Sequence, residues 1–296
     1  MKPATAICFW DYDTQWGGDR SRSGGGPKSW GGLEFPNTDK LLALHASYEM
    51  PACFAVVGAA ALPGVRPYHD PDQIRRIHAG GHEVASHSFR HDWLPALSRK
   101  DLTATLRESK AALEDCIGSP VTSFVPPYNQ PFDYPQAGSF SIAERREAGR
   151  DRTDLKQLCE SLAETGYTFC RVAYRPLHIR IAEMLSRRRI DLPSRAHAIA
   201  GVCCVRVNAS GFEASTLRLI ERCAERGGIA IIYGHPHSAT AGGSQDISLY
   251  VKVLDLLARL RREKRMDVCV PRQITAELLT KRASGLDLGL SGDGRE

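Results

Sequence analysis

The sequence predicts an α/β fold in which helices connect the strands of a parallel sheet. Short apolar runs rich in β-branched and aromatic residues alternate with longer amphipathic segments, which is typical of strand–helix–strand units. A chain of 296 residues with 42% hydrophobic and 25% charged residues fits one α/β barrel or two smaller domains. A barrel and a doubly wound sheet both satisfy these observations.

The expected strands are the short apolar runs, which are bounded by polar or turn-forming residues. They cover residues 4–10, 52–58, 83–86, 121–125, 168–173, 202–207, 229–233 and 267–270. The expected helices are the amphipathic segments, which cover 38–49, 71–79, 99–117, 152–165, 177–189, 214–226, 245–264 and 272–282. The helix over 99–117 has the clearest limits, because Ser98 is a suitable N-cap and Gly118 a suitable stop.

Three segments fall outside this alternation. Residues 17–32 are rich in glycine, which is typical of a mobile surface loop or of a lid over a pocket. Residues 129–150 are polar and long for a connection, which favours a substrate-binding loop or local disorder. We therefore expect one catalytic domain over residues 1–282, followed by a disordered tail over 283–296.

Composition and charge exclude several classes of protein. A net charge of +5 is compatible with an anionic substrate but is low for a nucleic-acid binder, and no nucleic-acid-binding motif accompanies it. The first apolar run meets Asp11 too early for a signal peptide, and no later run is long enough for a transmembrane segment. The nine cysteines are odd in number and irregularly spaced, which indicates buried thiols in a reducing compartment. We expect a cytoplasmic protein.

Two short motifs point to a metal centre. Asp11 and Asp13 follow an apolar run and, as residues i and i+2 of a strand, can face one pocket. His87 and His91 are spaced i and i+4, which places both imidazoles on one side of a helical turn. Either pair alone has a structural explanation, such as helix capping. Together, two histidines and one carboxylate form a common catalytic metal site, and the second carboxylate is left as a base.

Further polar motifs follow other strands. Pro126-Pro127-Tyr128 and Gly234-His235-Pro236-His237 each come directly after an expected strand. Catalytic groups gather at the carboxyl ends of parallel strands in barrels, so all four motifs are expected to converge. His235 and His237 are both candidates for a general acid, and we favour His235 because it is closer to the strand end.

The ordered motifs resemble those of a known enzyme family. They are Asp11-x-Asp13, Gly81-His82-Glu83 leading to His87-Ser88-x-x-His91, Phe124-Val125-Pro126-Pro127-Tyr128, and Tyr233-Gly234-His235. In this order they resemble the NodB-homology polysaccharide deacetylases, carbohydrate esterase family 4, over roughly residues 4–280. The resemblance implies a distorted (β/α)7-type barrel with one divalent metal ion. Zinc is the expected ion, with cobalt, nickel, manganese and iron(II) as other candidates.

The resemblance also implies a role for each matching residue. The metal ligands would be Asp13, His87 and His91. Asp11 would be the general base, His235 the general acid, and the backbone N–H of Tyr128 a donor to the oxyanion. The substrate would also contact Pro127, Tyr128 and His237. The implied reaction is hydrolysis of an N-acetyl or similar N-acyl group on an amino sugar, with the ion activating water and polarising the carbonyl.

The sequence departs from the family pattern at two positions. Tyr12 separates two acids that are usually adjacent, giving a D-x-D variant of the first motif. Val125 stands where the family's third motif usually begins with the arginine that orients the base. We expect Arg171, near the end of another strand, to supply that guanidinium to Asp11.

The substrate remains open at this level. Arg187-Arg188-Arg189, with Arg175 and Arg180 nearby, forms either a solvated helix face or a site for an anionic sugar linked to a nucleotide or lipid diphosphate. A precursor in lipopolysaccharide or O-antigen synthesis would fit. Two alternatives remain: hydrolysis of a cyclic imide or ureide on the same scaffold, and a non-catalytic carbohydrate-binding relative, which Val125 favours.

Overall fold

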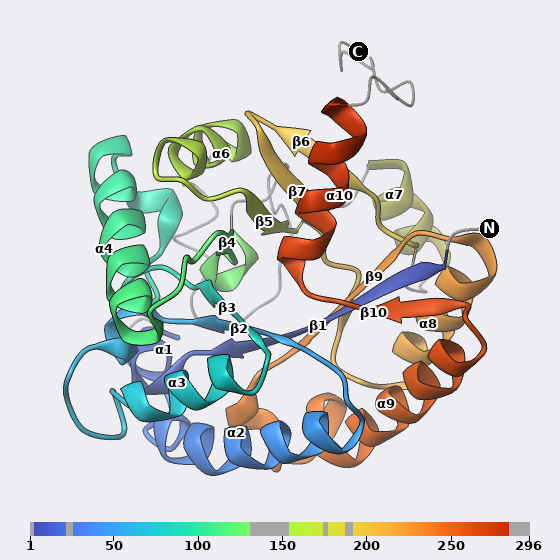
Figure 1. Ribbon diagram of the computed structural model, residues 1–296, viewed down its shortest axis with the longest axis horizontal. Helices are drawn as coiled ribbons and strands as arrows, with labels where there is room; N and C mark the ends of the chain where they lie inside the picture. The colour runs from blue at the N-terminus through green and yellow to red at the C-terminus, as the bar shows by residue number, and fades with distance from the viewer. Residues whose placement is uncertain (1–2, 22–25, 131–153, 174–176, 187–191, 284–296) are drawn as a thin grey trace.

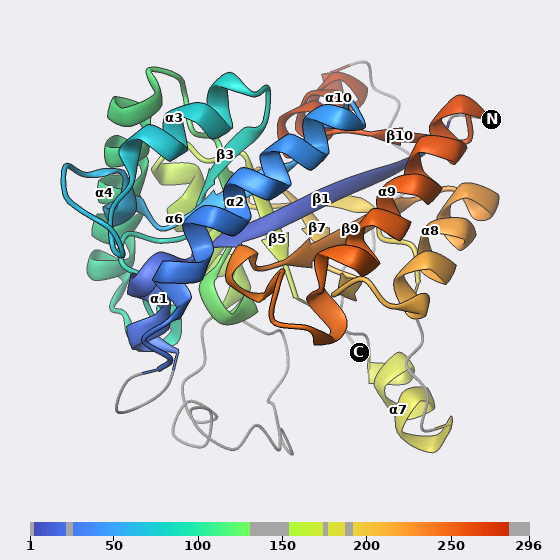
Figure 2. The same cartoon turned by 90° about the horizontal axis from the view of Figure 1, so that it is seen from below.

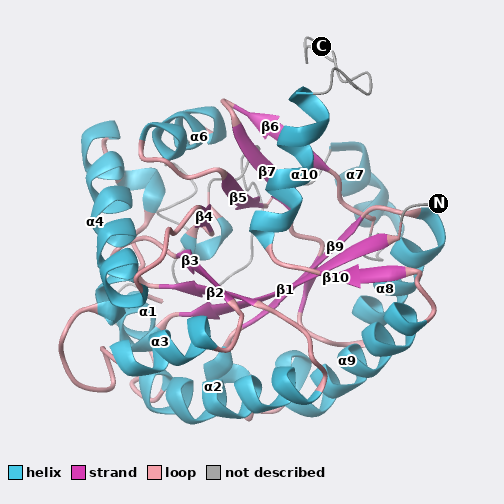
Figure 3. Cartoon of the chain, viewed as in Figure 1, coloured by secondary structure: helices cyan, strands magenta, loops and turns pink. Residues whose placement is uncertain are grey.

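The fold is a curled sheet with helices around its outside (Figure 1, Figure 3). The computed structural model describes residues 3–21, 26–130, 154–173, 177–186 and 192–283. Strands and helices alternate along the chain as the sequence predicts, and the parallel sheet curls into a barrel instead of lying open. The predicted α/β barrel is therefore confirmed.

The described strands form a single sheet. Their bounds are β1 (Ala4–Tyr12), β2 (Cys53–Val56), β3 (Glu83–Ser86), β4 (Ser123–Phe124), β5 (Phe169–Val172), β6 (Ala196–Ile199), β7 (Val202–Arg206), β8 (Ala209–Ser210), β9 (Ile229–Gly234) and β10 (Met266–Val268). The order is β6-β7-β5-β4-β3-β2-β1-β9-β8, and β10 pairs with the start of β1. The strands from β7 to β9 in this order pair in parallel, so their carboxyl ends meet at one edge.

The helices cover the outer face of the sheet, and Figure 2 shows α7 set apart from it. Their bounds are α1 (Thr14–Arg20), α2 (Trp30–Ser47), α3 (Pro71–Ala79), α4 (Arg99–Ile117), α6 (Leu155–Glu164), α7 (Leu177–Ser186), α8 (Ala214–Arg226), α9 (Ile247–Arg262) and α10 (Pro271–Ala283). Short 3₁₀ helices are η1 (Gly58–Ala61), η2 (Leu94–Ala96), η3 (Pro127–Asn129), η4 (Pro236–Ser238) and η5 (Gly243–Gln245). As predicted, Ser98 caps α4 and Gly118, with φ of 65°, ends it.

Strand β1 is buried on both faces, which explains its nearly continuous apolar sequence. Ile7 and Phe9 belong to the cluster that fills the inside of the barrel. Cys8 and Trp10 belong to a second cluster that packs against the surrounding helices. Asp11 follows Ile7 and Phe9 in the same alternation, so it continues the inward-facing row at the carboxyl end of the strand.

The barrel is closed by side chains as well as by strand pairing. Where the chain passes from β7 to β8, the Asn208 amide donates to the carbonyl of Ile229 at 3.0 Å and accepts from the N–H of Ile231 at 2.7 Å. At the amino end, Ile274 of α10 packs into the interior cluster. The N–H of Arg272 at the start of α10 donates to buried Glu83 at 3.0 Å. The polar groups that close the barrel are thus satisfied by hydrogen bonds.

Several details differ from the predictions. Helices α1 and α2 occupy much of the glycine-rich segment that we expected to be a loop, and β6 and β8 were not predicted. Position 17 in α1 requires glycine, because an added Cβ there would lie 2.5 Å from the Cβ of Asp13. Helix α2 starts at Trp30 and includes Pro36, so packing against the barrel overrides the weak local helix propensity.

Other predictions fall outside the described residues. These are the loop over 131–150 and the tail beyond Ala283. The extent of a single domain over residues 1–282 stays a prediction. Within the residues that the structure describes, none of the helices is both long enough and apolar enough to cross a membrane.

We predict that Gly58→Ala destabilises the fold by about 1–3 kcal/mol through overpacking. A Cβ at Gly58 would lie 2.6 Å from the Cα of Ser109 in α4, and the Gly58 N–H also donates to the Ser88 carbonyl at 2.9 Å. Urea unfolding followed by circular dichroism measures the change. Gly32→Ala in α2 is the matched control, because no atom lies within 4 Å of its added Cβ and alanine favours a helix. Equal stability of the two variants would contradict the packing argument.

Candidate metal centre and active site

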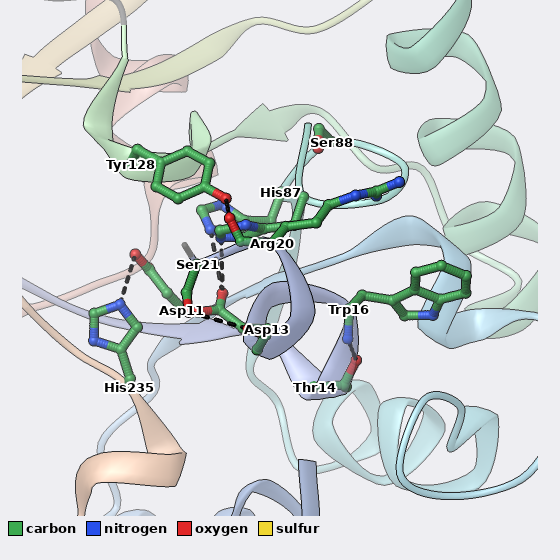
Figure 4. A network of polar contacts seen from close by, with 12 residues as sticks. Asp11, Asp13, Thr14, Trp16, Arg20, Ser21, His87, Ser88, Tyr128 and His235 are labelled. Carbon is green, nitrogen blue, oxygen red and sulfur yellow. Dashed lines mark hydrogen bonds and ion pairs between the residues drawn. The ribbon is translucent and has the colours of Figure 1, made fainter. Parts of the chain in front are cut away.

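Four polar motifs meet at the carboxyl edge of the sheet. Asp11 and Asp13 come from the end of β1, His87 follows β3, and His235 follows β9. Figure 4 shows these four side chains turned toward one common space, with Tyr128 on its far side. The parallel arrangement therefore brings together residues that are more than two hundred positions apart in sequence.

Asp13, His87 and His91 form a cluster that could hold a metal ion. The Oδ1 atom of Asp13 lies 3.4 Å from Nε2 of His87 and 3.6 Å from Nε2 of His91. One ligand atom from each residue lies within 4.8 Å of the others, and all three residues are buried. Asp13 Oδ1 has no hydrogen-bond donor among the described residues, although it is shut off from solvent. A buried oxygen of this kind, facing two imidazole nitrogens, fits a divalent cation of the zinc type.

The histidine motif reaches this geometry without a helix. Residues 87–91 form turns, and both Ser88 (φ 61°) and His91 (φ 59°) have left-handed backbone conformations. The expected helical turn is therefore wrong, although both imidazoles do face Asp13. The loop is held instead by tertiary hydrogen bonds: the Ser88 carbonyl accepts from Gly58 at 2.9 Å and from the Ser109 hydroxyl at 3.0 Å. Backbone strain at two positions is compatible with a site that the surroundings hold in place.

The imidazole orientations are partly fixed by the protein. Nδ1 of His87 donates to the carbonyl of Val125 at 2.7 Å, which leaves Nε2 as the atom that faces Asp13. The ring of His91 packs edge-on against Tyr128, with centroids 4.5 Å apart. Val125 thus contributes its backbone carbonyl to the site, while its side chain lies in the apolar interior of the barrel.

Charges within the cluster shift the pKa of each member. Burial alone would raise the pKa of Asp13, but His91 and His87 beside it lower that pKa below its usual range. Burial disfavours the charged form of His87, but Asp13 and Asp11 outweigh it and raise the His87 pKa. Burial dominates at His91 and lowers its pKa to about 4. The site therefore favours an ionised carboxylate.

Asp11 is held by Arg171, which lies on β5 on the other side of the barrel interior. The guanidinium donates two parallel hydrogen bonds, Nη1 to Oδ1 at 2.7 Å and Nη2 to Oδ2 at 2.6 Å. Burial would raise the pKa of Asp11, but Arg171 outweighs it and lowers that pKa. This pair is the contact that we expected from the sequence as a replacement for the arginine missing at Val125.

Further contacts fix the Arg171 guanidinium, which is only 1% exposed. Its Nη2 also donates to Asn129 Oδ1 at 3.3 Å, and Asn129 in turn donates to the Tyr233 hydroxyl at 3.0 Å. The guanidinium carbon lies 4.4 Å from the centroid of the Tyr233 ring and 5.2 Å from that of Phe9. Arg171 is therefore fixed both by hydrogen bonds and by aromatic packing.

The two histidines after β9 have different surroundings. His235 is partly exposed, and its Nε2 lies 4.0 Å from Oδ2 of Asp11. Its Nδ1 lies 3.1 Å from Oε1 of Gln245, which can only accept a hydrogen bond, so Nδ1 is the donor. His237 is buried, and its Nδ1 lies 3.2 Å from Oε2 of Glu34 on α2. His235 is thus the imidazole that faces Asp11 directly.

The turn after β4 places Tyr128 beside the metal cluster. Pro127 is buried and begins η3, and Tyr128 follows with a left-handed backbone (φ 57°, ψ 13°). The Tyr128 ring packs between His91 and Trp93, and its hydroxyl donates to the carbonyl of Arg20 at 2.5 Å. Buried Pro127 therefore precedes Tyr128 in the same short helix. Contact of Pro127 or Tyr128 with a substrate stays a prediction.

Reasoning from the sequence missed several residues of the site. Glu34, Asn129 and Gln245 lie in segments without a recognisable motif, and each contacts one of the predicted residues. The signal for Glu34 was weak: it is an acid on the buried face of a helix whose start the sequence did not predict. Arg187-Arg188-Arg189 and Arg175 fall outside the described residues, and the side chain of Arg180 is not described.

Comparisons with known proteins agree with this geometry. A family model described as polysaccharide deacetylase matches residues 32–136, which include both histidines of the cluster. A chitooligosaccharide deacetylase of Sinorhizobium fredii (strain NBRC 101917 / NGR234) is 37% identical over 76 residues, which is 26% of this chain. That match spans 33% of the relative, so the chain aligns with about a third of its length. The resemblance that the motifs indicated is confirmed.

Comparison with solved structures supports this fold. A structure from Mycobacterium smegmatis of the polysaccharide deacetylase type covers 95% of this chain and 92% of its own, with a TM-score of 0.59 at 15% identity. A family 4 carbohydrate esterase from Streptomyces lividans, in complex with acetate, has a TM-score of 0.46 at 13% identity, covering 91% of this chain and 92% of its own. The likeness to the first supports the distorted (β/α)7-type barrel.

We predict that Arg171→Met lowers the free energy of unfolding by about 3–5 kcal/mol near neutral pH, because it leaves the Asp11 carboxylate buried without its partner. The lowered pKa of Asp11 stabilises the fold above its unfolded-state pKa, and this stabilisation is lost as the pH falls through the lowered folded-state pKa. The difference between wild type and variant should therefore shrink in acid, as urea titrations at several pH values would measure.

The control for this variant is Arg76→Met. Arg76 pairs with Asp39 on the surface, where both side chains are about half exposed, and exposed pairs contribute within about 1 kcal/mol. If Arg171→Met destabilised the protein equally at neutral and acidic pH, lost packing and not lost charge would be the cause.

We predict that zinc affinity falls as the pH decreases, beginning above about 6.5, the ordinary imidazole value. Metal binding requires neutral imidazoles, and His87, whose pKa is raised, is the first of the two to take up a proton. Competition with a chromophoric chelator over a pH series measures the affinity. Zinc binding by His82→Gln, which removes a buried histidine outside the cluster, should follow the wild-type curve. An affinity that does not change with pH would exclude the histidines as ligands.

Proposed function

We propose that this chain, a member of the polysaccharide deacetylase family, is a metal-dependent hydrolase that removes an N-acetyl or similar N-acyl group from an amino sugar. The observation that carries the proposal is the pairing of two unlike carboxylates in one buried site. Asp13 faces two imidazoles, whereas Asp11 is held apart from them by the Arg171 guanidinium. A ligand and a base require this division of roles.

The proposed roles follow from these positions. Asp13, His87 and His91 would hold one divalent ion, zinc being the expected one. When bound there, such an ion lowers the pKa of a coordinated water and polarises an amide carbonyl. Side chains and a backbone N–H of the protein would accept and donate the protons and stabilise the developing negative charge.

Asp11, fixed by two hydrogen bonds and kept ionised, would accept the proton of the attacking water. His235, whose Nε2 lies 4.0 Å from Asp11, would donate a proton to the leaving amine. The backbone N–H of Tyr128 would donate to the oxyanion. The left-handed backbone of Tyr128 sets the direction of this N–H. His237, Tyr128 and Pro127 would border the sugar.

We propose an anionic precursor, linked to a nucleotide or lipid diphosphate, as the substrate class. Two guanidinium groups support this: those of Arg20 and Arg90 each lie 5.8 Å from the centroid of the Trp16 ring. Arg90 is exposed and stands between the two histidines of the cluster in sequence. Guanidinium groups bind phosphate well, and a cation in the 87–91 turn suits a phosphate-bearing sugar. A lipopolysaccharide or O-antigen precursor would meet this description.

The function is tested by hydrolysis assays with the zinc-loaded protein, in which acetate release is measured for the N-acetylated sugars and ring opening, followed by liquid chromatography, is measured for the cyclic imide. The panel contains an N-acetylated chitooligosaccharide, a nucleotide-diphosphate N-acetylamino sugar and a cyclic imide. We expect hydrolysis of the nucleotide-linked sugar, with Asp11→Asn lowering kcat by about 10²–10⁴-fold because the general base is lost. Zinc content, measured by atomic absorption, should be unchanged in Asp11→Asn and lost in Asp13→Ala.

The panel separates this proposal from the two alternatives. Turnover of the cyclic imide alone would reassign the reaction. A protein that binds zinc stoichiometrically but hydrolyses none of the three compounds would be a carbohydrate-binding relative. The pairing of Arg171 with Asp11 supports catalysis, since it supplies the guanidinium whose absence at Val125 favoured an inactive protein.

A further inference from the structure

Helix α2 carries a carboxylate that has no exposed surface. Glu34 is 0% exposed, and its Oε1 atom has no hydrogen-bond partner among the described residues. Burial raises the pKa of this carboxyl well above its ordinary value, and the nearby charge of Asp13 adds to the shift. Because burying such a group is costly, an apolar side chain of similar size would stabilise the helix better. The position therefore needs an explanation other than stability.

The Glu34 side chain forms a hydrogen bond with the imidazole of His237. Oε2 of Glu34 lies 3.2 Å from Nδ1 of His237, in the η4 turn after β9. The flat face of His237 stacks on Trp30, with ring centroids 4.0 Å apart and planes at 12°. Trp30, Glu34 and Asn37 follow one another along one side of α2, and Asn37 donates to the Pro236 carbonyl of the same turn at 2.8 Å. Helix α2 thus holds this turn at three successive points.

These contacts leave one edge of the His237 imidazole available. Nε2 makes no hydrogen bond to the described residues, and it is not one of the side-chain atoms that are both unpaired and shut off from solvent. The His237 ring lies 5.1 Å from that of His235, which itself lies beside Asp11. His237 therefore stands one ring away from the reacting groups, where the sugar that carries the amide would lie. A neighbour bonded to Nδ1 fixes both the orientation of an imidazole and its tautomer.

We propose that Glu34 is a positioning residue that acts through His237: it holds the imidazole in one orientation so that Nε2 can hydrogen-bond to a sugar hydroxyl next to the scissile amide. This inference rests on the proposed function, and it deepens that function by assigning the residue that prepares the sugar contact. Trp30 supports the same ring from its face.

The experiment compares Glu34→Leu, which removes the hydrogen bond, with Glu34→Gln, whose amide can still bond to Nδ1. Loss of a contact made in both ground and transition states raises KM and leaves kcat nearly unchanged. We expect Glu34→Leu to raise KM by about tenfold, the effect of one lost hydrogen bond. Glu34→Gln should stay within about twofold of wild type. Zinc content should be the same in all three proteins.

A matched control is available at the opposite end of the barrel. Glu83 is also a buried carboxyl with a raised pKa, and it bonds to Ser123 and to the N–H of Arg272, away from the site. Glu83→Leu should lower stability without changing KM. If Glu83→Leu and Glu34→Leu raised KM equally, a general effect of removing a buried acid would explain both, and the proposal would be overturned.

A second readout does not depend on activity. In zinc-loaded protein with ¹⁵N-labelled histidine, long-range ¹H–¹⁵N spectra report the tautomer of His237, which is assigned by comparison with His237→Gln. We expect a single tautomer in the wild type and in Glu34→Gln, and a mixture in Glu34→Leu. An unchanged spectrum in Glu34→Leu would overturn the positioning role even if no deacetylase activity were found.

The conservative variant decides the outcome if Glu34→Leu fails to fold. A KM for Glu34→Gln that rises as far as that of His237→Gln would show that charge, and not orientation, is what Glu34 supplies. If the wild-type protein showed no turnover but His237 kept a single tautomer, the result would contradict the proposed function and not the positioning role of Glu34.

Discussion

The site depends on one buried ion pair, which joins Asp11 on β1 to Arg171 on β5. Both groups lie inside the barrel, so neither charge could stay there without the other. Two parallel hydrogen bonds of 2.6–2.7 Å fix the carboxylate plane, and the aromatic rings of Tyr233 and Phe9 fix the guanidinium. With Asp11 neutralised in this way, Asp13 two residues later can face His87 and a cation without strong repulsion from its neighbour. The two carboxylates thereby have different partners, as the proposed roles of base and ligand require.

The barrel interior is mainly apolar, and the predicted site residues gather at one edge of the sheet because of strand geometry. Parallel strands place their carboxyl ends together, so each strand can contribute one or two polar side chains at its end while its remaining residues stay apolar. In β1 the inward-facing side chains are apolar at Ile7 and Phe9 and acidic at Asp11, the last of these three alternate positions. The opposite end is closed by α10, which takes Glu83 as its one buried acidic partner among the described residues. The predicted site residues consequently lie together at the carboxyl end of the sheet.

Local sequence was sufficient for the parts of the structure that depend on local patterns. Strand ends, the limits of α4 and the convergence of Asp11 with His87 follow from hydrophobic periodicity and from capping residues. The turn at 87–91 did not follow, because its left-handed residues are held by Gly58 and α4, which are distant in sequence. Helix α2 was predicted too short for the same reason: its first turns contain glycine and proline and are stabilised by tertiary packing. Glu34 went unnoticed because an isolated acid in a helix usually faces solvent.

Val125 shows how the partner of a buried carboxylate can be supplied from a different place in the chain. Its side chain fills the barrel interior and its carbonyl orients His87, so the backbone contribution of this position does not depend on which side chain stands there. The guanidinium that the family pattern places at this position comes instead from Arg171, outside the 32–136 segment that the family model matches. A survey that judged catalytic competence by the residue at position 125 would classify this chain as inactive. A survey that asked whether any guanidinium reaches Asp11 would find Arg171, so the presence of this group in such barrels is better decided in three dimensions than along the alignment.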